Sequence, residues 1–395
     1  MRHVFPPAHS PIRLASLASG TRAVAFPRLS DRTRLTDELI ARTGSEFVHL
    51  VDSGTSALRL AIRIAAACRP NRPIAIPSWA CFDIVSAVMG ENVPVVIYDI
   101  DPKTLCPIPS TIAAAADLKP CAIVLVHLFG VPVDVTKVRA VVDANTLLIE
   151  DCAQSWGAMF QSQHLGSQGD VSIFSFGRGK GITGGSGGAV ALRRDMYAPA
   201  SRNFVPATAV RPGFRDLLRA LSVWAFSHPS VYAAPASMPF LRLGETRLRK
   251  PHPIEPISNA AAAIVSRNIV AANNAVFQRR ERAYEYLHEL PSDWVVQVSP
   301  DAEPGWLRFP VLAPDVETKK NWLVRLRDLG IAPGYPNPLS AILGDVGFPQ
   351  STTHRDDGGN TLANRLVTLP THELISHDEA LLITSQMQTI MSAPN

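Results

Sequence analysis

Short apolar runs alternate with amphipathic segments along residues 46–151. The runs share an excess of valine, isoleucine and leucine, which is typical of buried strands. They cover residues 46–51, 72–77, 93–99, 122–130 and 146–151. Segments with helical periodicity lie between them, at residues 56–68, 82–90 and 134–143. Apolar strands joined by amphipathic helices predict an α/β fold with a mostly parallel central sheet between layers of helices.

Polar residues follow these predicted strands where each strand ends. The polar stretches are DSGTS at 52–56, PSWAC at 77–81, HLFG at 127–130 and EDCAQ at 150–154. In parallel sheets, ligands bind beyond the carboxyl ends of the strands. We therefore expect these four loops to converge on one crevice.

The rest of the chain predicts a second, smaller unit. Two further strands are expected at 171–176 and 188–192, and a Pro-, Arg- and aromatic-rich insertion follows at about 195–250. A long helix is expected at 257–290, and short strand and helix patterns follow it. A length of 395 residues favours two domains. We expect a large domain over 1–250, which includes the N-terminal segment and the insertion, and a small C-terminal α+β domain over 251–395.

Charge and cysteine content exclude several classes of protein. The net charge is only +4 and the arginines are scattered, so we expect no nucleic acid partner. The five cysteines show no paired spacing, which favours a reducing, cytoplasmic setting and predicts neither disulfides nor a metal site. The N-terminus lacks the apolar stretch of a secretory signal.

The most apolar window, residues 217–241, is interrupted by Arg219, His228 and prolines. It cannot supply the roughly 20 uninterrupted apolar residues that a membrane span needs. A buried or dimer-covered helix pair is the preferred interpretation of this window, and a helix on a membrane surface is the alternative.

The chain concentrates glycines around one lysine. Seven of the residues 177–188 are glycine, and Lys180 lies among them. The string GKGITG resembles a dinucleotide-binding motif, but no helix can follow it, and a phosphate-binding P-loop would need other residues at Phe174 and Gly181. A partly desolvated lysine amine in a flexible loop can attack a carbonyl to form a Schiff base. The alternative is a surface lysine at the tip of a hairpin.

Other residues favour a site for an anionic, ring-containing cofactor. Asp151 ends a buried strand, where its carboxylate requires a cationic partner such as a protonated pyridine, unless it merely caps a helix. Gly54, Thr55 and Ser56 stand where a strand turns into a helix, so their backbone N–H groups can hold a phosphate or simply form an N-cap. Ser175 could add a hydroxyl to the same phosphate.

Six motifs occur in the order expected of one known family. They are GTSAL, PVVIYDIDPKT, VHLFGVPVDV, EDCAQSWGA, LGSQGDVSIFSFGRGKGITGGSGGAV and VTLPTHELIS. In this order they resemble the DegT-type aminotransferases, which are pyridoxal-phosphate enzymes of fold type I that act on nucleotide-linked keto sugars. The resemblance is dense over residues 51–192, looser from 257 onwards, and absent through the insertion.

The resemblance implies roles for individual residues. Lys180 would hold the cofactor covalently and move a proton during the reaction, and Asp151 would pair with the pyridine nitrogen. Gln154 would lie beside the phenolic oxygen of the ring. Gly54, Thr55 and Ser175 would surround the phosphate.

The chain also departs from the family pattern. Where relatives carry an aromatic residue that stacks on the cofactor ring, this chain offers Trp79 or Phe82, and we favour Trp79. The Asn-x-Arg element that reaches the partner subunit is replaced by residues 254–256, and Arg247 or Arg249 is a candidate substitute. His127 and His372 lie in matching stretches, either bordering the pocket or packed within the protein.

From the resemblance we expect a cytoplasmic, homodimeric aminotransferase that depends on pyridoxal phosphate. Its expected substrates are a keto sugar, nucleotide-linked, and glutamate as amino donor, in amino-sugar, polysaccharide or secondary-metabolite biosynthesis. One alternative is a transaminase of a non-sugar carbonyl, and another is a non-catalytic relative of the fold. Sugar dehydratases of this fold replace the lysine by histidine, so Lys180 disfavours that activity.

Overall fold

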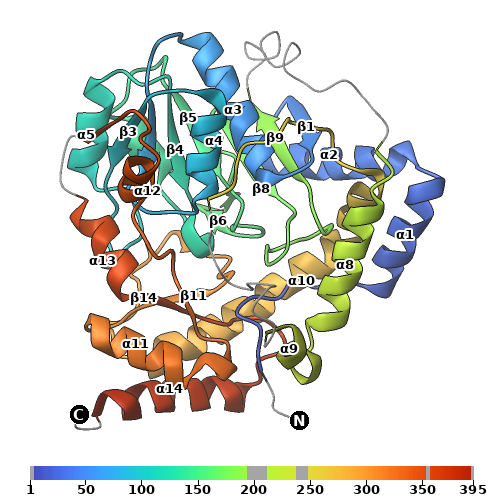
Figure 1. The fold of residues 1–395 in the computed structure, drawn as a ribbon, viewed down its shortest axis with the longest axis vertical. Helices are drawn as coiled ribbons and strands as arrows, with labels where there is room; N and C mark the ends of the chain where they lie inside the picture. The colour runs from blue at the N-terminus through green and yellow to red at the C-terminus, as the bar shows by residue number, and fades with distance from the viewer. Residues whose placement is uncertain (1–3, 194–210, 237–247, 353–355, 393–395) are drawn as a thin grey trace.

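A computed structural model describes residues 4–193, 211–236, 248–352 and 356–392. Its centre is an eight-stranded sheet in the order β1-β9-β8-β5-β4-β2-β3-β13 (Figure 1). The strands are β1 Phe47–Val51, β2 Ile74–Pro77, β3 Val95–Tyr98, β4 Ala122–Val126, β5 Leu147–Asp151, β8 Val171–Ser175, β9 Gly188–Leu192 and β13 Gln350–Thr352. Strand β9 is antiparallel to both of its neighbours, and the other pairs are parallel. The predicted mostly parallel sheet is therefore confirmed.

The parallel direction brings the ends of β1, β8, β5, β4 and β2 to one edge of the sheet. Four of the helices along the sheet are α3 Gly54–Cys68, α4 Asp83–Glu91, α5 Pro109–Asp117 and α6 Val135–Arg139. Helix α5 was not expected from the sequence. The apolar run 122–130 was expected as one strand, but β4 ends at Val126, and a short 3-10 helix, η1 Leu128–Gly130, follows. The loops after the parallel strands can thus meet in one place.

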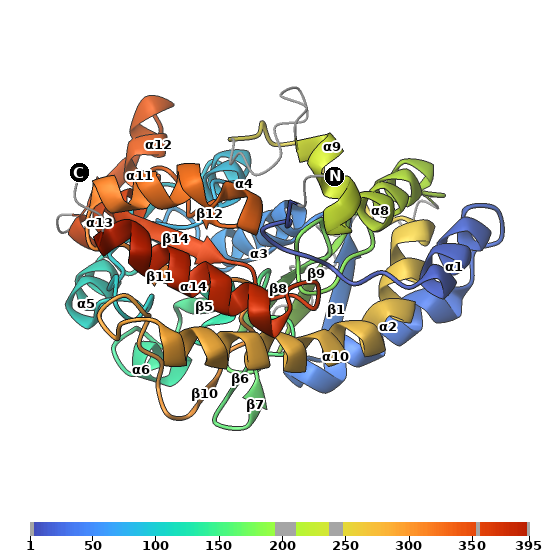
Figure 2. The same cartoon turned by 90° about the horizontal axis from the view of Figure 1, so that it is seen from below.

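The long predicted helix is α10, Asn259–Glu289. Two N-terminal helices that the sequence analysis did not predict, α1 Leu14–Ala25 and α2 Leu29–Thr43, pack along it. Figure 2 shows α10 running beneath the molecule from the side of α1 and α2 to the side of α14. Helix α10 thereby connects the N-terminal helices to the C-terminal part of the chain.

The C-terminal part forms a three-stranded antiparallel sheet with helices. The strands are β11 Phe309–Leu312, β12 Ala332–Pro333 and β14 Leu366–Leu369, in the order β11-β14-β12. The helices are α11 Val316–Arg325, α12 Leu339–Asp345, α13 Asp357–Arg365 and α14 His377–Ser392. A further three-stranded sheet has the order β10-β6-β7, with β6 Met159–Phe160, β7 Gln163–His164 and β10 Ala302–Glu303. Strand β13 returns to the main sheet beside β3, and a domain boundary at residue 250 remains a prediction.

Part of the predicted insertion forms two helices, α8 Phe214–Phe226 and α9 Pro229–Ala236. Leu217 and Ala220 of α8 pack with Leu17 of α1 and with Ile264 of α10. The opposite side of α8 exposes Leu218, and residues 195–210 and 237–247 of the predicted insertion lie outside the described residues. Over the described ranges, every helix is too short or too polar to span a membrane.

Candidate functional site

Lys180 lies in the loop between β8 and β9 and is half-buried. The hydroxyl of Ser10 donates a hydrogen bond to the Lys180 carbonyl oxygen at 2.7 Å, so the N-terminal segment fixes the lysine backbone. Gly179, immediately before it, adopts the left-handed conformation with φ +72°, which favours glycine. The lysine side chain is therefore presented by a backbone that is held in place.

Two glycines of this loop, Gly184 and Gly185, allow it to pack closely against neighbouring helices. A Cβ atom on Gly184 would lie 2.6 Å from the Ala261 carbonyl oxygen on α10. One on Gly185 would meet the backbone of α8 at Asp216, again well inside van der Waals contact. The loop is accordingly buried for most of its length. Side chains larger than hydrogen would separate the loop from the helices that support it.

Asp151 ends β5 with a buried side chain, as expected. Its carboxylate accepts a hydrogen bond from the Ala153 N–H at 2.9 Å. Burial raises the pKa of Asp151, while the Ala153 N–H and the positive charge of Lys180 oppose that rise. Burial and Asp83 raise the pKa of Cys81 to about 12, again against the charge of Lys180. Lys180 therefore lies within electrostatic reach of both Asp151 and Cys81.

The start of α3 has the features of a phosphate site. Ser53 caps the helix by accepting the Ser56 N–H at 3.1 Å, so this N–H is engaged in the helix cap. Ser53 pairs with Gly187 in a parallel β-bridge, which turns the Gly54 N–H toward the Gly187 carbonyl, and among the described residues none accepts the Thr55 N–H. A Cβ on Gly54 would lie 2.7 Å from the Ser175 hydroxyl oxygen, which places that hydroxyl against the helix start. A free N–H group at a helix N-terminus together with a serine hydroxyl suits an anion.

Gln154 is held by two hydrogen bonds on opposite sides of its amide. Its oxygen accepts the Phe129 N–H at 2.8 Å, and its nitrogen donates to the Tyr335 hydroxyl at 2.6 Å. Tyr335 was missed by the sequence analysis, because a tyrosine in a loop more than 150 residues away carries no local signal. Its contact with Gln154 joins the C-terminal part of the chain to the edge of the main sheet.

Trp79 is fully buried, with 0% of its surface exposed. Its indole N–H donates to the Tyr335 carbonyl oxygen at 2.9 Å, and its ring lies against the rings of Tyr335 and Phe129. The alternative, Phe82, is also buried, with 4% exposed. The structure thus offers no open face of either ring, and the burial of Trp79 gives the stacking prediction no support.

His372 is packed inside the protein. It donates a hydrogen bond from Nε2 to the Pro6 carbonyl oxygen at 2.8 Å. Burial and the neighbouring His9 lower the pKa of His372 to about 4, so its imidazole is neutral at pH 7. His372 therefore holds the N-terminal segment that also carries Ser10.

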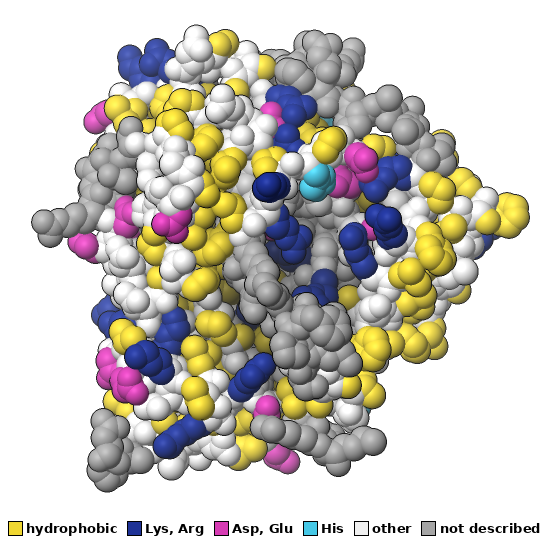
Figure 3. All heavy atoms as spheres, in the orientation of Figure 1, with side chains coloured by type: hydrophobic (Ala, Val, Ile, Leu, Met, Phe, Trp, Pro, Cys, Tyr) yellow, Lys and Arg dark blue, Asp and Glu magenta, His cyan; other side chains and the backbone are white. Residues whose placement is uncertain are grey.

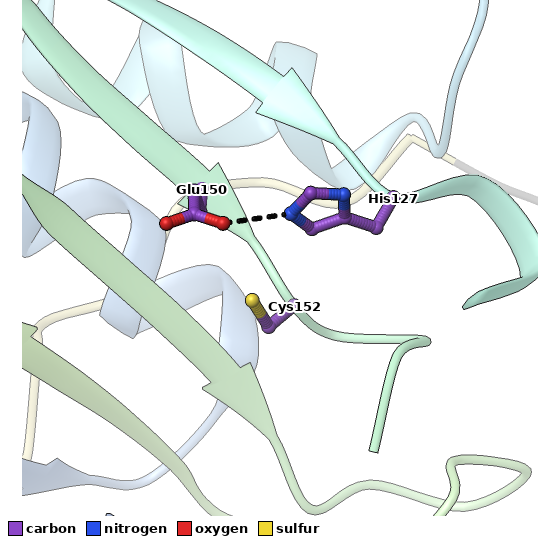
Figure 4. Close-up of side chains that lie close together, drawn as sticks. All are labelled: His127, Glu150 and Cys152. Carbon is purple, nitrogen blue, oxygen red and sulfur yellow. Dashed lines mark hydrogen bonds and ion pairs between the residues drawn. The ribbon is translucent and has the colours of Figure 1, made fainter. Parts of the chain in front are cut away.

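His127, Glu150 and Cys152 form a buried cluster at the ends of β4 and β5 (Figure 4). His127 Nε2 lies 3.0 Å from Glu150 Oε2, and His127 Nδ1 accepts the Val133 N–H at 3.1 Å. The bond to Val133 places the proton on Nε2, which donates to the carboxylate.

The carboxylate of Glu150 is fully engaged. Besides His127, the N–H groups of Gly166, Gln168 and Gly169 donate to its oxygens. Burial acts to raise the pKa of Glu150, but the hydrogen bond from His127 and these N–H groups outweigh it and lower the pKa. Because the nitrogen and oxygen ligand atoms are already hydrogen-bonded, the cluster is a structural pair next to Asp151 rather than a cation site.

The replaced Asn-x-Arg segment runs along the edge of the main sheet. The Glu255 N–H donates to Asp52 at 3.1 Å, and the Glu255 carboxylate pairs with Arg211 at 3.0 Å. Of the two candidate substitutes, Arg249 donates its backbone N–H to Ser86 at 3.3 Å, and Arg247 lies outside the described residues. A contact to a second subunit from this segment stays a prediction.

Solved structures of similar fold extend over almost the whole chain. The sugar aminotransferase CalS13 from Micromonospora echinospora is 22% identical, with 98% of this chain and 99% of that chain covered and a TM-score of 0.73. An E. coli GDP-4-keto-6-deoxy-D-mannose-3-dehydratase with bound hydrated PLP is 16% identical, with 98% and 100% covered and a TM-score of 0.77. The chain therefore has the fold type I architecture of pyridoxal-phosphate enzymes, which confirms the expected fold.

Sequence comparison supports the resemblance. The model of the DegT/DnrJ/EryC1/StrS aminotransferase family matches residues 30–215 of this chain. The L-glutamine:2-deoxy-scyllo-inosose aminotransferase of Streptoalloteichus tenebrarius is 35% identical over 212 residues, which cover 51% of this chain and 50% of that protein. The chain spans about half the length of this curated relative. The resemblance drawn from the motifs is thus confirmed.

Proposed function

We propose that this protein is a pyridoxal-phosphate-dependent aminotransferase that acts on a cyclic polyhydroxy ketone. One observation carries the proposal. The half-buried Lys180 lies within electrostatic reach of the buried Asp151 carboxylate, at the sheet edge where α3 begins against Ser175. The sequence match to aminotransferases over residues 30–215 supports the same activity.

The residues present fit pyridoxal phosphate. Gly54, Thr55 and Ser175 would hold the phosphate, because N–H groups and a hydroxyl meet there. Asp151 would hold the protonated ring nitrogen, since its buried carboxylate requires a cationic partner. Gln154 would lie beside the phenolic oxygen. When bound, the cofactor supplies an aldehyde for the substrate amine and a cationic ring that accepts electrons from the reacting carbon.

The protein's own groups would perform the proton chemistry and the positioning. Lys180 would anchor the cofactor covalently through Nζ. Once released, Nζ of Lys180 would take the proton from the α-carbon of the amino donor and return a proton to the carbon that receives the amine. Asp151 would keep the ring nitrogen protonated, and the buried surroundings would strengthen this ion pair.

We propose L-glutamine as the amino donor and a keto sugar or keto cyclitol as the acceptor. Several of the curated relatives are named for L-glutamine and an inosose, a cyclic ketone without a nucleotide. These names favour glutamine over the glutamate expected from the motifs. The second candidate acceptor is a nucleotide-linked keto sugar, which the motif resemblance favours.

The test is to titrate the purified protein with pyridoxal phosphate and then to supply ¹⁵N-labelled donors. We expect a visible absorbance band that L-glutamine bleaches, followed by transfer of the label to a cyclic ketone. A scyllo-inosose and a nucleotide-linked keto sugar should be offered in parallel, with a simple acyclic ketone as control. Binding of the cofactor without transfer to any cyclic ketone would contradict the proposed substrate class.

We further propose that the protein works as a homodimer in the cytoplasm. Helix α10 exposes large apolar side chains that a second copy could cover, and Phe277 is 63% and Tyr284 66% exposed. The five cysteines are free, which supports a reducing compartment. Light scattering after size exclusion should give twice the mass of the chain, and the mass of a single chain would contradict the dimer.

A further inference from the structure

The N-terminal strap, residues 4–10, runs from α9 to the loop that carries Lys180. In Figure 1 it passes in front of α10, and it begins beside α9, where the Val4 N–H donates to the Pro229 carbonyl oxygen at 3.4 Å. The end of a chain is usually poorly ordered unless contacts tie it down. The strap is tied down along its length, and these contacts offset the conformational entropy lost on ordering it.

The C-terminal part of the chain holds the first half of the strap. The Phe5 side chain is buried, with 6% of its surface exposed. His372 donates a hydrogen bond to the Pro6 carbonyl oxygen at 2.8 Å. His9 Nδ1 lies 2.9 Å from Glu373 Oε1. The strap is therefore fixed to the segment that directly follows β14.

The other end of the strap binds the backbone of the lysine loop. Ser10 is 2% exposed, and its hydroxyl donates to the Lys180 carbonyl oxygen at 2.7 Å. Arg279 of α10 is 1% exposed and donates to the carbonyl oxygens of His9 and Gly181, each at 3.5 Å. The strap, the loop and α10 thus meet at the backbone of Lys180, and Ser10 makes the shortest of these hydrogen bonds.

The opposite side of the loop is open. The loop between β8 and β9 lies in the middle of the view in Figure 1, and Figure 3 shows the surface hollowed there, with Lys and Arg side chains around the hollow. Residues 177–180 are half-buried or exposed, whereas residues 181–185 are buried. An amine that must reach a substrate cannot be packed on every side. The position of Lys180 therefore depends on how its own backbone is held.

We propose that Ser10 is a positioning residue for amino transfer, an inference that rests on the proposed aminotransferase function. By binding the Lys180 carbonyl oxygen, Ser10 holds the backbone from which Nζ reaches the reacting carbon. A reacting group that is misplaced by about 1 Å costs about 100-fold in rate. Ser10 binds the backbone of Lys180 and not its amine, so its effect on the reaction passes through Lys180.

The experiment compares wild type with Ser10→Ala, Ser10→Thr and the control Ser19→Ala. Ser19 lies in α1, where its hydroxyl donates to the Ala15 carbonyl oxygen at 2.9 Å, so the control removes a similar bond within one helix. In the cofactor-free proteins, hydrogen exchange of peptides covering residues 177–183 is followed by mass spectrometry. With pyridoxal phosphate bound, the rate at which L-glutamine bleaches the visible absorbance band is measured by stopped flow over a range of glutamine concentrations.

We expect hydrogen exchange in residues 177–183 to rise at least about threefold in Ser10→Ala, because the Lys180 carbonyl oxygen loses its partner. The maximal bleaching rate should fall about 10- to 100-fold. The glutamine concentration that gives half this rate and the affinity for pyridoxal phosphate should stay within about threefold, because the position of Lys180 affects the reaction rather than binding. Ser10→Thr keeps the hydroxyl and should recover most of the rate, and Ser19→Ala should match wild type in every measurement.

Two results would overturn the positioning role. One is unchanged exchange at residues 177–183 in Ser10→Ala. The other is faster exchange together with a wild-type bleaching rate, because Ser10 would then serve only the fold. Melting curves show whether each variant is folded. If Ser10→Ala is unfolded, His372→Phe provides the comparison, since it releases the strap at Pro6 and leaves Ser10 unchanged, and it should change exchange and bleaching in the same direction.

The proposed function can fail separately. A wild-type protein that binds no pyridoxal phosphate, or whose band neither L-glutamine nor L-glutamate bleaches, contradicts the proposed function directly. The exchange measurement needs neither cofactor nor turnover, so it still decides whether Ser10 holds the lysine loop. If the cofactor binds without bleaching, the rate at which borohydride traps the cofactor on Lys180 is compared instead, and equal rates in Ser10→Ala and wild type would overturn the positioning role.

Discussion

Replacing Glu150 by glutamine tests the role given to the buried pair beside Asp151. Each oxygen of the Glu150 carboxylate accepts two hydrogen bonds, one oxygen from Gly166 and His127 and the other from Gln168 and Gly169. A glutamine keeps one of these oxygens and places an NH₂ group against the other two donors. Two buried donors therefore lose their acceptor in either orientation of the amide.

The expected cost follows from that count. Each buried donor left without an acceptor costs about 1–3 kcal/mol, so Glu150→Gln should lower the free energy of unfolding by about 2–6 kcal/mol. For a protein of this size the melting temperature should fall by about 2–7 °C. The matched control is Glu317→Gln, which removes an exposed carboxylate 3.6 Å from Lys320 and should change little.

Thermal melting followed by circular dichroism measures the effect, with and without EDTA. We expect a clear drop for Glu150→Gln, no drop for Glu317→Gln, and no effect of EDTA on wild type. A Glu150→Gln protein that melts within about 1 °C of wild type would refute the reasoning from hydrogen bonds. A drop of wild-type stability in EDTA would instead indicate that the cluster of His127, Glu150 and Cys152 holds a metal.

Three further predictions follow from the site. Gly54→Ala should weaken pyridoxal phosphate binding at least tenfold in absorbance titrations, because the added Cβ would lie 2.6 Å from the Ser175 side chain. The control is Gly344→Ala, whose added Cβ would lie no closer than 3.7 Å to another residue, and it should bind the cofactor normally. Asp151→Asn should slow amino transfer about 10³-fold. The reason is that the ion pair between Asp151 and the protonated ring nitrogen, at about 4 Å, is worth about 4 kcal/mol at an effective dielectric constant near 20. Equal single-turnover rates for Asp151→Asn and wild type would contradict this prediction. Burial opposes ionisation of Glu373, but the hydrogen bond from His9 lowers the pKa of Glu373 to about 2. The ion pair therefore stabilises the protein fully above about pH 4.5, and this stabilisation is lost as the pH falls toward 2. Acid unfolding should begin at higher pH in Glu373→Gln than in wild type, and superimposable acid curves would exclude the pair.

The sequence predicted the features that depend on local pattern. Strand ends are recognisable because β-branched runs stop at polar residues, so the pattern alone places Asp151 and the helix start at Gly54 at one edge of the sheet. Lys180 is recognisable because a lysine among glycines is unusual in composition. These signals lie within a few residues of the groups they identify.

The sequence could not predict contacts between segments far apart in the chain. Tyr335 and Ser10 approach the site through tertiary packing, and nothing near them in sequence marks them. Helix α1 was missed for a similar reason. Its Gly20 lowers helix propensity, but a Cβ there would lie 2.6 Å from Ile264, so the glycine permits the close packing that stabilises the helix.

One role of the loop glycines could not be predicted from the sequence. Glycine-rich composition favours flexibility in general. Here Gly184 and Gly185 lie against the backbones of α10 and α8, and such contacts appear only in three dimensions.

The most direct test of the account is to identify the residue that carries the cofactor. The purified protein is incubated with pyridoxal phosphate, reduced with borohydride and digested, and the modified peptide is mapped by mass spectrometry. The account predicts a single pyridoxyl label on Lys180, and loss of both the label and the visible absorbance band in Lys180→Ala. A label on another lysine, or a protein that stays colourless with added pyridoxal phosphate, would contradict it.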